Sequence, residues 1–171
     1  MRAFGPSSPL TYCTQGMISP QESKACTIRK PRQADEASWR KLWAQYVAFY
    51  EAEISEEVTN GTWQRMLAED SGMFGRVAER DGVMVGFSVC ILHAGSWTLD
   101  PTCYLEDLFV DPAMRGRGVG KALIDDLVML GRERGWSRLY WHTRASNAVA
   151  RKLYDIFAEA DDFVRYRLFL R

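Results

Sequence analysis

The sequence has few of the residues that mark metal centres, disulfide frameworks or membrane spans. Among 171 residues there are four cysteines and two histidines; no two cysteines have CxxC spacing, and the histidines lie far apart. This pattern predicts no metal site and favours free thiols in a cytoplasmic protein. No apolar run approaches the roughly 18 residues that span a membrane. The N-terminal stretch lacks the apolar core of a signal peptide, so we expect no membrane contact.

The chain also lacks net charge, because 22 basic residues balance 22 acidic ones. Bulk charge therefore gives no reason to expect a nucleic-acid partner. The charges are unevenly distributed, however. Residues 35–107 hold 13 acidic and 5 basic side chains, and residues 111–171 hold 8 acidic and 12 basic ones. This split is either ordinary surface charge or the mark of two ligands of opposite sign.

What the chain does contain is a regular alternation of strand and helix patterns. Residues 1–24 are rich in Ser, Pro and Gly and predict a flexible tail, so a single domain is expected over residues 25–171. A helix is predicted to start at Asp35 or Ser38 and a hairpin to turn at Asp81-Gly82. The expected strands are 25–29, 74–79, 83–92, 104–110, 137–143 and 163–170, and the expected helices are 35–50, 62–69, 119–134 and 147–158. This order predicts a mixed sheet covered by helices.

One segment, MRGRGVGKAL at residues 114–123, combines three glycines with three basic residues between a strand and a helix. It fits neither the Walker loop nor the dinucleotide GxGxxG fingerprint. A glycine-rich turn at the start of a helix nevertheless suits an anion, because the first amides of a helix have no partner within it. A plain tight turn with a helix cap is the alternative.

The segment VDPAMRGRGVGKAL resembles the acyl-coenzyme A signature [RQ]xxGx[GA] of the GNAT N-acetyltransferases. The later SNAVARKLY is similar to the family's second coenzyme region, and YLEDLFV is most similar to the spermidine/spermine and thialysine acetyltransferase branch. The resemblance implies an α/β (α+β) fold, with a mixed, mostly antiparallel sheet that splays in the middle and about four helices. Many members carry Gly-Phe after the last helix, where this chain has AEADDF.

The resemblance also implies a binding site for acetyl-coenzyme A as acyl donor, without a metal. The pantothenate amides would pair with the backbone of Leu108, Phe109 and Val110, as an added strand does. Asn147 would hold a coenzyme carbonyl, or serve only as a helix N-cap. The expected contacts around the pyrophosphate are Arg115, Gly116, Arg117, Gly118, Val119, Gly120 and Lys121.

Acetyl transfer to an amine needs a base, since only about one alkylammonium in a thousand is deprotonated at pH 7. Strict alternation along YLEDLFV places Glu106 and Asp107 on opposite faces. The resemblance makes Glu106 the base, acting through water, and Asp107 is interpreted as structural. The alternative is that Glu106 only binds the acceptor. The resemblance makes Tyr154, two helical turns after Asn147, the proton donor to the departing thiolate; a core tyrosine is the alternative.

The resemblance implies that the first two helices and the loop before YLEDLFV form the acceptor pocket. Its candidates are Tyr46, Tyr50, Trp63 and Glu106, together with Glu51, Glu53, His93 and Trp97. Aromatic and acidic side chains suit a cation. A small cationic amine, such as a polyamine, diamine or basic amino-acid analogue, is therefore the predicted acceptor. The alternatives are a protein or peptide acetyltransferase and a non-catalytic coenzyme A module. A homodimer is expected from the resemblance.

Overall fold

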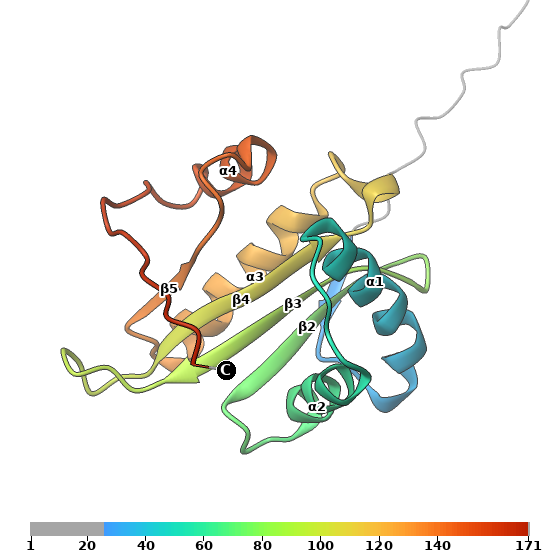
Figure 1. The fold of residues 1–171 in the computed structure, drawn as a ribbon, viewed down its shortest axis with the longest axis horizontal. Coiled ribbons are helices and arrows are strands. Elements are labelled where there is room, and N and C mark those ends of the chain that lie inside the picture. The colour runs from blue at the N-terminus through green and yellow to red at the C-terminus, as the bar shows by residue number, and fades with distance from the viewer. Residues whose placement is uncertain (1–25, 171) are drawn as a thin grey trace, which may run out of the picture.

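A computed structural model describes residues 26–170 and contains one five-stranded sheet with four α-helices (Figure 1). The strands are β1 Thr27–Arg29, β2 Met73–Arg80, β3 Val83–His93, β4 Thr102–Val110 and β5 Arg138–Trp141, in that spatial order. The helices are α1 Glu36–Phe49, α2 Glu56–Leu67, α3 Val119–Arg134 and α4 Ala148–Tyr154. Only the β4–β5 pair is parallel. The expected mixed sheet is confirmed; the tail predicted at 1–24 lies outside the described residues.

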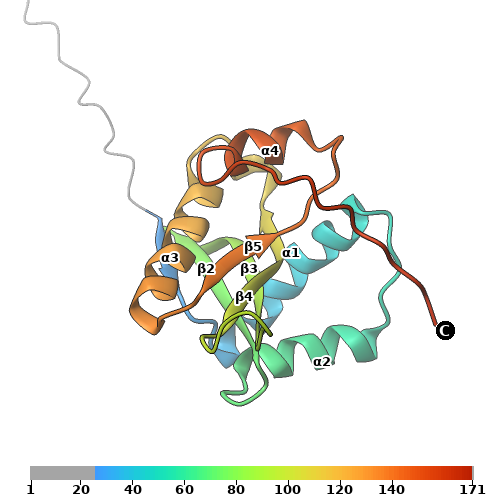
Figure 2. The ribbon, with the colours of Figure 1, turned by 90° about the vertical axis from the view of Figure 1, so that its left-hand side faces the viewer.

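The helices cover the two faces of the sheet unequally. Helices α1 and α2 lie on one face and α3 on the other (Figure 2). Three tryptophans pack together between the first face and its helices. The ring centroids of Trp43 and Trp63 each lie 5.1 Å from that of Trp39. The fully buried side chains of α3 on the opposite face are Leu123, Ile124 and Leu127. No helix among residues 26–170 is both long and apolar enough to cross a membrane.

Strand β4 carries one extra residue. Asp107 pairs with Val89 and Leu105 pairs with Cys90, so Glu106 has no partner on β3. This is a β-bulge, which locally breaks the alternation of side chains between the two faces of a sheet. Strict alternation is therefore wrong at this point of the strand.

The bulge puts both carboxylates on the same face. Leu105 and Leu108 both pack in the core beneath α3. Under strict alternation, two residues that are three positions apart would lie on opposite faces of the sheet. Asp107 instead contacts a side chain of α1. Glu106 and Asp107 therefore both belong to the α1 side, contrary to the sequence-based prediction.

The sheet splays beyond the bulge, as the resemblance implied. The pairing between β4 and β5 runs from Thr102 to Leu105 on one strand and from Arg138 to Trp141 on the other. Strand β4 continues to Val110, still paired with β3, while β5 has ended. The edge of β4 that faces away from β3 is thereby left without a neighbouring strand over its last residues.

Two helices differ in length from the prediction. Helix α2 begins at Glu56 rather than at residue 62, because Ser55 caps it by accepting a hydrogen bond from the amide of Val58. Helix α4 begins after Asn147, as predicted, but ends at Tyr154 rather than at residue 158. The chain after it forms short-range turns in place of the last helical turn.

The predicted closing strand at 163–170 is wrong: the structure has neither helix nor strand there. Its apolar side chains are mostly exposed, from Val164 at 73% to Tyr166 at 91%. The alternating pattern is compatible with a strand, but a strand also needs a partner edge, which sequence alternation does not specify.

Candidate active site

A cleft of about 550 Å³ opens where β4 and β5 part. Its walls come from the end of β4, the glycine loop, the start of α3, α4 and the end of α1. The predicted residues that line it are Tyr46, Tyr50, Leu108, Phe109, Val110, Arg115, Gly116, Gly118, Val119, Gly120, Lys121, Asn147 and Tyr154. The structure thus brings together most of the residues assigned to the donor site from the sequence.

The glycine loop holds backbone amides at the mouth of α3. Gly116 and Gly118 have φ of +72° and +80°, a region that favours glycine, and Gly118 is the N-cap of α3. The amide of Ala122 donates to the carbonyl of Gly118 at 2.9 Å, so the amides from Gly118 to Lys121 precede the first helical hydrogen bond. Such amides bind anions well.

Gly120 serves a different purpose from the two glycines before it. A Cβ atom at this position would lie 2.9 Å from Cδ2 of Leu153. The missing side chain therefore allows α4 to approach the start of α3. This approach closes the cleft on the side opposite β4.

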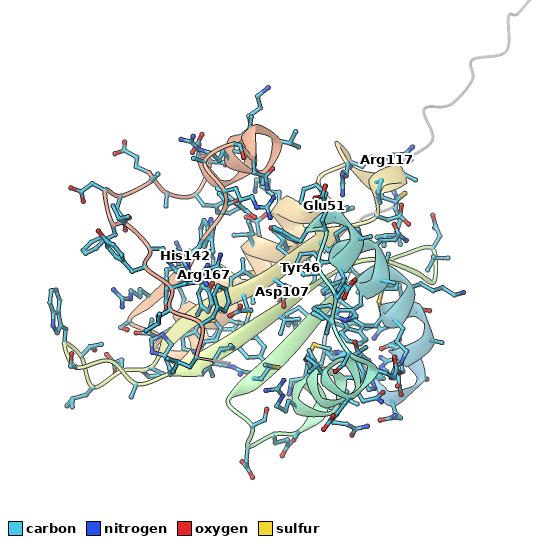
Figure 3. The ribbon with its side chains drawn as sticks, viewed as in Figure 1. Tyr46, Glu51, Asp107, Arg117, His142 and Arg167 are labelled. Atoms are coloured by element: carbon cyan, nitrogen blue, oxygen red, sulfur yellow. The ribbon has the colours of Figure 1, made fainter. Side chains whose placement is uncertain are left out.

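The basic residues of the loop lie around its rim. The Arg115 guanidinium donates to the carbonyl of Val110 at 3.3 Å and lies 5.7 Å from the centroid of the Phe109 ring. Lys121 forms an ion pair with Asp125 at 2.8 Å. Arg117 is exposed (Figure 3). The charge around the amides is positive, which suits a diphosphate.

The two predicted residues of α4 face the cleft. The Asn147 side chain caps the helix by accepting from the amide of Ala150, and it donates to Thr143 Oγ1 at 3.2 Å. The Tyr154 ring lies 5.4 Å from that of Trp141. Burial raises the pKa of Tyr154 to about 12, so its hydroxyl keeps its proton at neutral pH.

Asp107 is the carboxylate that the structure singles out. It accepts a hydrogen bond from the Tyr46 hydroxyl at 2.5 Å, and the two lie together over the middle of the sheet (Figure 3). Burial, opposed by the Tyr46 hydrogen bond and aided by Glu106, raises the pKa of Asp107 to about 6. Glu106 itself is exposed. The sequence analysis interpreted Asp107 as structural and predicted neither its burial nor its raised pKa.

The sequence did contain a signal for this arrangement. Aliphatic residues and cysteine recur at Cys103 and Leu105 and then at Leu108 and Val110, so their spacing lengthens from two residues to three between Leu105 and Leu108, and Phe109 takes the alternate position after it. An alternation that skips one residue is what a bulge produces. The residue pair within the skip is Glu106-Asp107.

Trp63 does not belong to the acceptor pocket in which the sequence analysis placed it. Its side chain is fully buried and packs on Trp39 in the core between α1, α2 and the sheet. A large apolar ring in this position stabilises the core and cannot contact a ligand. Trp97, by contrast, is 98% exposed in the β3–β4 connection.

The acceptor side has a composition that the sequence reasoning missed. His93 was expected there, and it contacts Tyr140 of β5. His142, just after β5, contacts Tyr104 of β4. Arg144 lies 5.2 Å from the centroid of the Tyr50 ring. Imidazole and guanidinium groups thus lie around the region where the sequence analysis expected the acceptor pocket.

Comparison with known proteins places this site in a family. The model of the acetyltransferase (GNAT) family matches residues 35–157. The chain therefore belongs to the GNAT family and is an acyltransferase of the N-acetyltransferase type. The D-amino-acid N-acetyltransferase HPA3 of Saccharomyces cerevisiae is 32% identical over 135 residues, which cover 78% of this chain and 84% of that protein.

Solved structures share the fold. A ribosomal-protein-alanine N-acetyltransferase from Brucella melitensis biovar Abortus 2308 is 26% identical with a TM-score of 0.70, covering 86% of this chain and all of that one. The aminoglycoside N-acetyltransferase AAC(6')-Iy, solved in complex with CoA, has a TM-score of 0.71 at 24% identity and covers 84% and 95% of the two chains. GNAT relatives thus bind coenzyme A.

The glycine loop gives a first testable prediction. In Gly118→Ala the space around the new methyl group is open, but the left-handed backbone of the helix cap becomes strained by about 1–2 kcal/mol. If the loop relaxes, its amides lose their alignment. We expect the dissociation constant for coenzyme A, measured by calorimetry, to rise roughly tenfold.

Gly61→Ala is the matched control. Gly61 also has open space around it, lies within α2 and has ordinary helical backbone angles. Its replacement should leave coenzyme A affinity unchanged and raise the free energy of unfolding by about 0.5–1 kcal/mol. Equal affinities for both variants would show that the Gly118 conformation does not support binding.

Proposed function

We propose that the protein transfers the acetyl group of acetyl-coenzyme A to the primary amine of a small acceptor by direct attack. The observation that carries the proposal is the cleft. It joins the open amides at the start of α3 to the unpaired edge of β4, and it reaches Tyr46, the hydrogen-bond partner of Asp107. Tyr154 lines the same cleft, and this arrangement supports a donor, a proton acceptor and a proton donor that act together.

The donor is held mainly by backbone. The diphosphate lies on the amides of the glycine loop, with Arg115 and Arg117 near its charge. The pantetheine amides pair with the edge of β4 at Leu108–Val110, where β5 no longer takes up the hydrogen bonds. An amide near Leu108 stabilises the oxyanion that forms on the thioester carbonyl.

Asp107 is the proposed base, and Glu106 is the proposed ligand of the acceptor ammonium. A carboxylate with a pKa of about 6 is ionised at pH 7 and accepts a proton more readily than an ordinary aspartate. The Tyr46 hydrogen bond fixes its position. Of the two roles considered for Glu106 from the sequence, binding fits its exposure better, although proton transfer through water remains the competing hypothesis.

Tyr154 is the proposed acid. The acceptor ammonium first loses one proton to solvent through Asp107, which gives a neutral amine. As the amine nitrogen bonds to the thioester carbon, a second proton passes from it to Asp107, and the carbon–sulfur bond then breaks. The departing thiolate takes the hydroxyl proton of Tyr154, whose raised pKa keeps it protonated beforehand. After the products leave, Asp107 releases its proton to solvent and Tyr154 regains one from solvent. No covalent enzyme intermediate is needed.

The acceptor remains open between two kinds of small amine. The carboxylates at the bulge support the cationic amine predicted from the sequence. Arg144 beside Tyr50 supports an amino acid, whose carboxylate it would bind, and the yeast relative is named for D-amino acids. The relatives named above do not support the polyamine branch in particular. The cytoplasmic location and the homodimer remain predictions from the sequence.

A screen of acetyl-coenzyme A consumption tests the function directly. The acceptors are polyamines, D- and L-amino acids, aminoglycosides and a basic peptide. We expect turnover with at least one class of small primary amine. Turnover with the peptide alone would favour a peptide acetyltransferase, and tight coenzyme A binding without any turnover would favour the non-catalytic module.

Tyr154→Phe tests the proton donor. Removal of one hydroxyl leaves the ring packed on Trp141, so coenzyme A should bind as before. We expect kcat to fall by about 10²–10³, within the usual range for general acid catalysis. An unchanged kcat would remove Tyr154 from the mechanism.

The roles of the two carboxylates separate in Asp107→Asn and Glu106→Gln. In the wild type we expect kcat/KM to fall below about pH 6, because protonated Asp107 cannot act as a base. Asp107→Asn should lower kcat about 100-fold and abolish the fall of kcat/KM at low pH. Glu106→Gln should mainly raise KM and leave the fall of kcat/KM at low pH in place. The reverse pattern would return the role of base to Glu106.

A further inference from the structure

Two tyrosines and two histidines form a continuous group on the strands next to the bulge. We call the group, made of His93, Tyr104, Tyr140 and His142, the tyrosine–histidine wall. The Tyr104 and Tyr140 rings lie 4.9 Å apart on paired strands, and His142 lies 5.3 Å from Tyr104. None of these residues lines the cleft described above.

The wall lies on the face of the sheet that carries the carboxylates. Leu139 and Trp141 pack in the core beneath α3, so the alternating Tyr140 and His142 lie on the opposite side, toward α1. Tyr104 is placed on that side by the same argument from its neighbour Leu105. Along an extended strand, two residues span about 6–7 Å, which separates Tyr104 from Glu106.

Hydrogen bonds fix the orientation of both phenols. His93 Nδ1 lies 2.9 Å from the carbonyl oxygen of Ala94, an acceptor, so in neutral His93 this nitrogen carries the proton. His93 Nε2, 3.0 Å from the Tyr140 hydroxyl, is then the acceptor of that hydroxyl's proton. The Tyr104 hydroxyl is paired with His142 Nδ1 at 3.1 Å. Both hydroxyls are thus held by protein groups.

Arginines contribute positive charge at the wall. The Arg138 guanidinium lies 5.1 Å from the centroid of the Tyr140 ring, and the Tyr104 ring packs on the same ring with an interplanar angle of 30°. These contacts use ring faces, which are the parts that attract cations. Burial and the Glu106 carboxylate raise the pKa of Tyr104, and Arg165 opposes that shift. Arg138 and Arg165 thus disfavour a second ammonium group of the acceptor at the wall, while Glu106 at its edge binds the first.

We propose that the tyrosine–histidine wall binds an aromatic ring of the acceptor, so that the preferred substrates are arylalkylamines or aromatic amino acids. The inference rests on the proposed function. The amine lies at Glu106 and Asp107, and the ring, about two carbons away, meets the ring edges and Arg138. Ring edges are positive and attract the electron-rich face of another aromatic ring.

The test compares acceptors on the wild-type protein. The acceptors are 2-phenylethylamine, n-hexylamine, spermidine and 4-aminobutyrate, with acetyl-coenzyme A as donor. We expect kcat/KM for 2-phenylethylamine to exceed that for n-hexylamine about two- to tenfold, and spermidine to be poorer than both. A higher value for spermidine, or for the aliphatic carboxylate, would overturn the inference while leaving the proposed function intact.

Substitutions test whether the tyrosine–histidine wall causes the preference for the aromatic acceptor. Tyr140→Leu should reduce the ratio between phenylethylamine and hexylamine toward one, mainly through KM. Tyr166→Leu is the matched control, since Tyr166 is 91% exposed, and should leave the ratio unchanged. Coenzyme A affinity reports whether each variant folds. If Tyr140→Leu does not fold, Tyr104→Leu, which removes the other ring of the pair, replaces it with the same expected fall of the ratio.

The outcomes separate the two proposals. Coenzyme A binding without turnover of these four amines would reject the inference, and the same result with every small amine of the wider acceptor screen would reject the proposed function itself. Turnover with equal ratios in wild type and Tyr140→Leu would reject the wall as the binding site of the acceptor. A ratio that falls only in Tyr140→Leu supports the inference.

Discussion

The site depends on a break in backbone pairing within a single strand. Strand β4 gains a residue at Glu106 and loses its neighbour β5 directly before it. Unpaired backbone amides and carbonyls are costly to bury unless they form hydrogen bonds with another group. This edge can therefore form hydrogen bonds with a ligand that has amides of its own. The same bulge turns Asp107 toward Tyr46 of α1. The bulge and the end of β5 fall at the same point of β4, and together they leave its outer edge unpaired and bring Asp107 to the α1 side of the sheet.

The position of Asp107 has a thermodynamic consequence. Its pKa is higher in the folded protein, about 6, than the ordinary value of 3.8, so the folded state binds the proton more tightly. Stability therefore falls as the pH rises from about 4 to 6, and the ionised carboxylate destabilises the fold at neutral pH. The hydrogen bond from Tyr46 offsets part of this cost. The raised pKa of Asp107 thus comes with a loss of stability at neutral pH.

The sequence was most informative where local patterns decide the structure. The bounds of α3 and the hairpin at Asp81-Gly82 follow from apolar spacing and turn residues, and the glycine loop follows from its position before a helix. Contacts between segments that lie far apart in the sequence were harder to predict. Trp63 reads equally well as a pocket or a core residue until α2 is packed against α1. The segment 163–170 alternates as a strand does, yet whether it pairs depends on an edge elsewhere in the fold.

The uneven charge along the chain now has a physical interpretation. Four of the 13 acidic side chains of residues 35–107 form ion pairs with arginines: Asp35 and Glu79 with Arg29, and Glu36 and Glu56 with Arg40. Asp126 of α3 pairs in turn with Arg76 of β2, so ion pairs also link the two halves. The acidic count therefore overstates the unpaired negative charge of this half, to which Glu106 and Asp107 at the bulge contribute. In the proposed function, backbone groups hold the donor and side chains hold the acceptor. Donor recognition would then follow from a short motif, whereas acceptor recognition would depend on the local balance of charge between the bulge and Arg138.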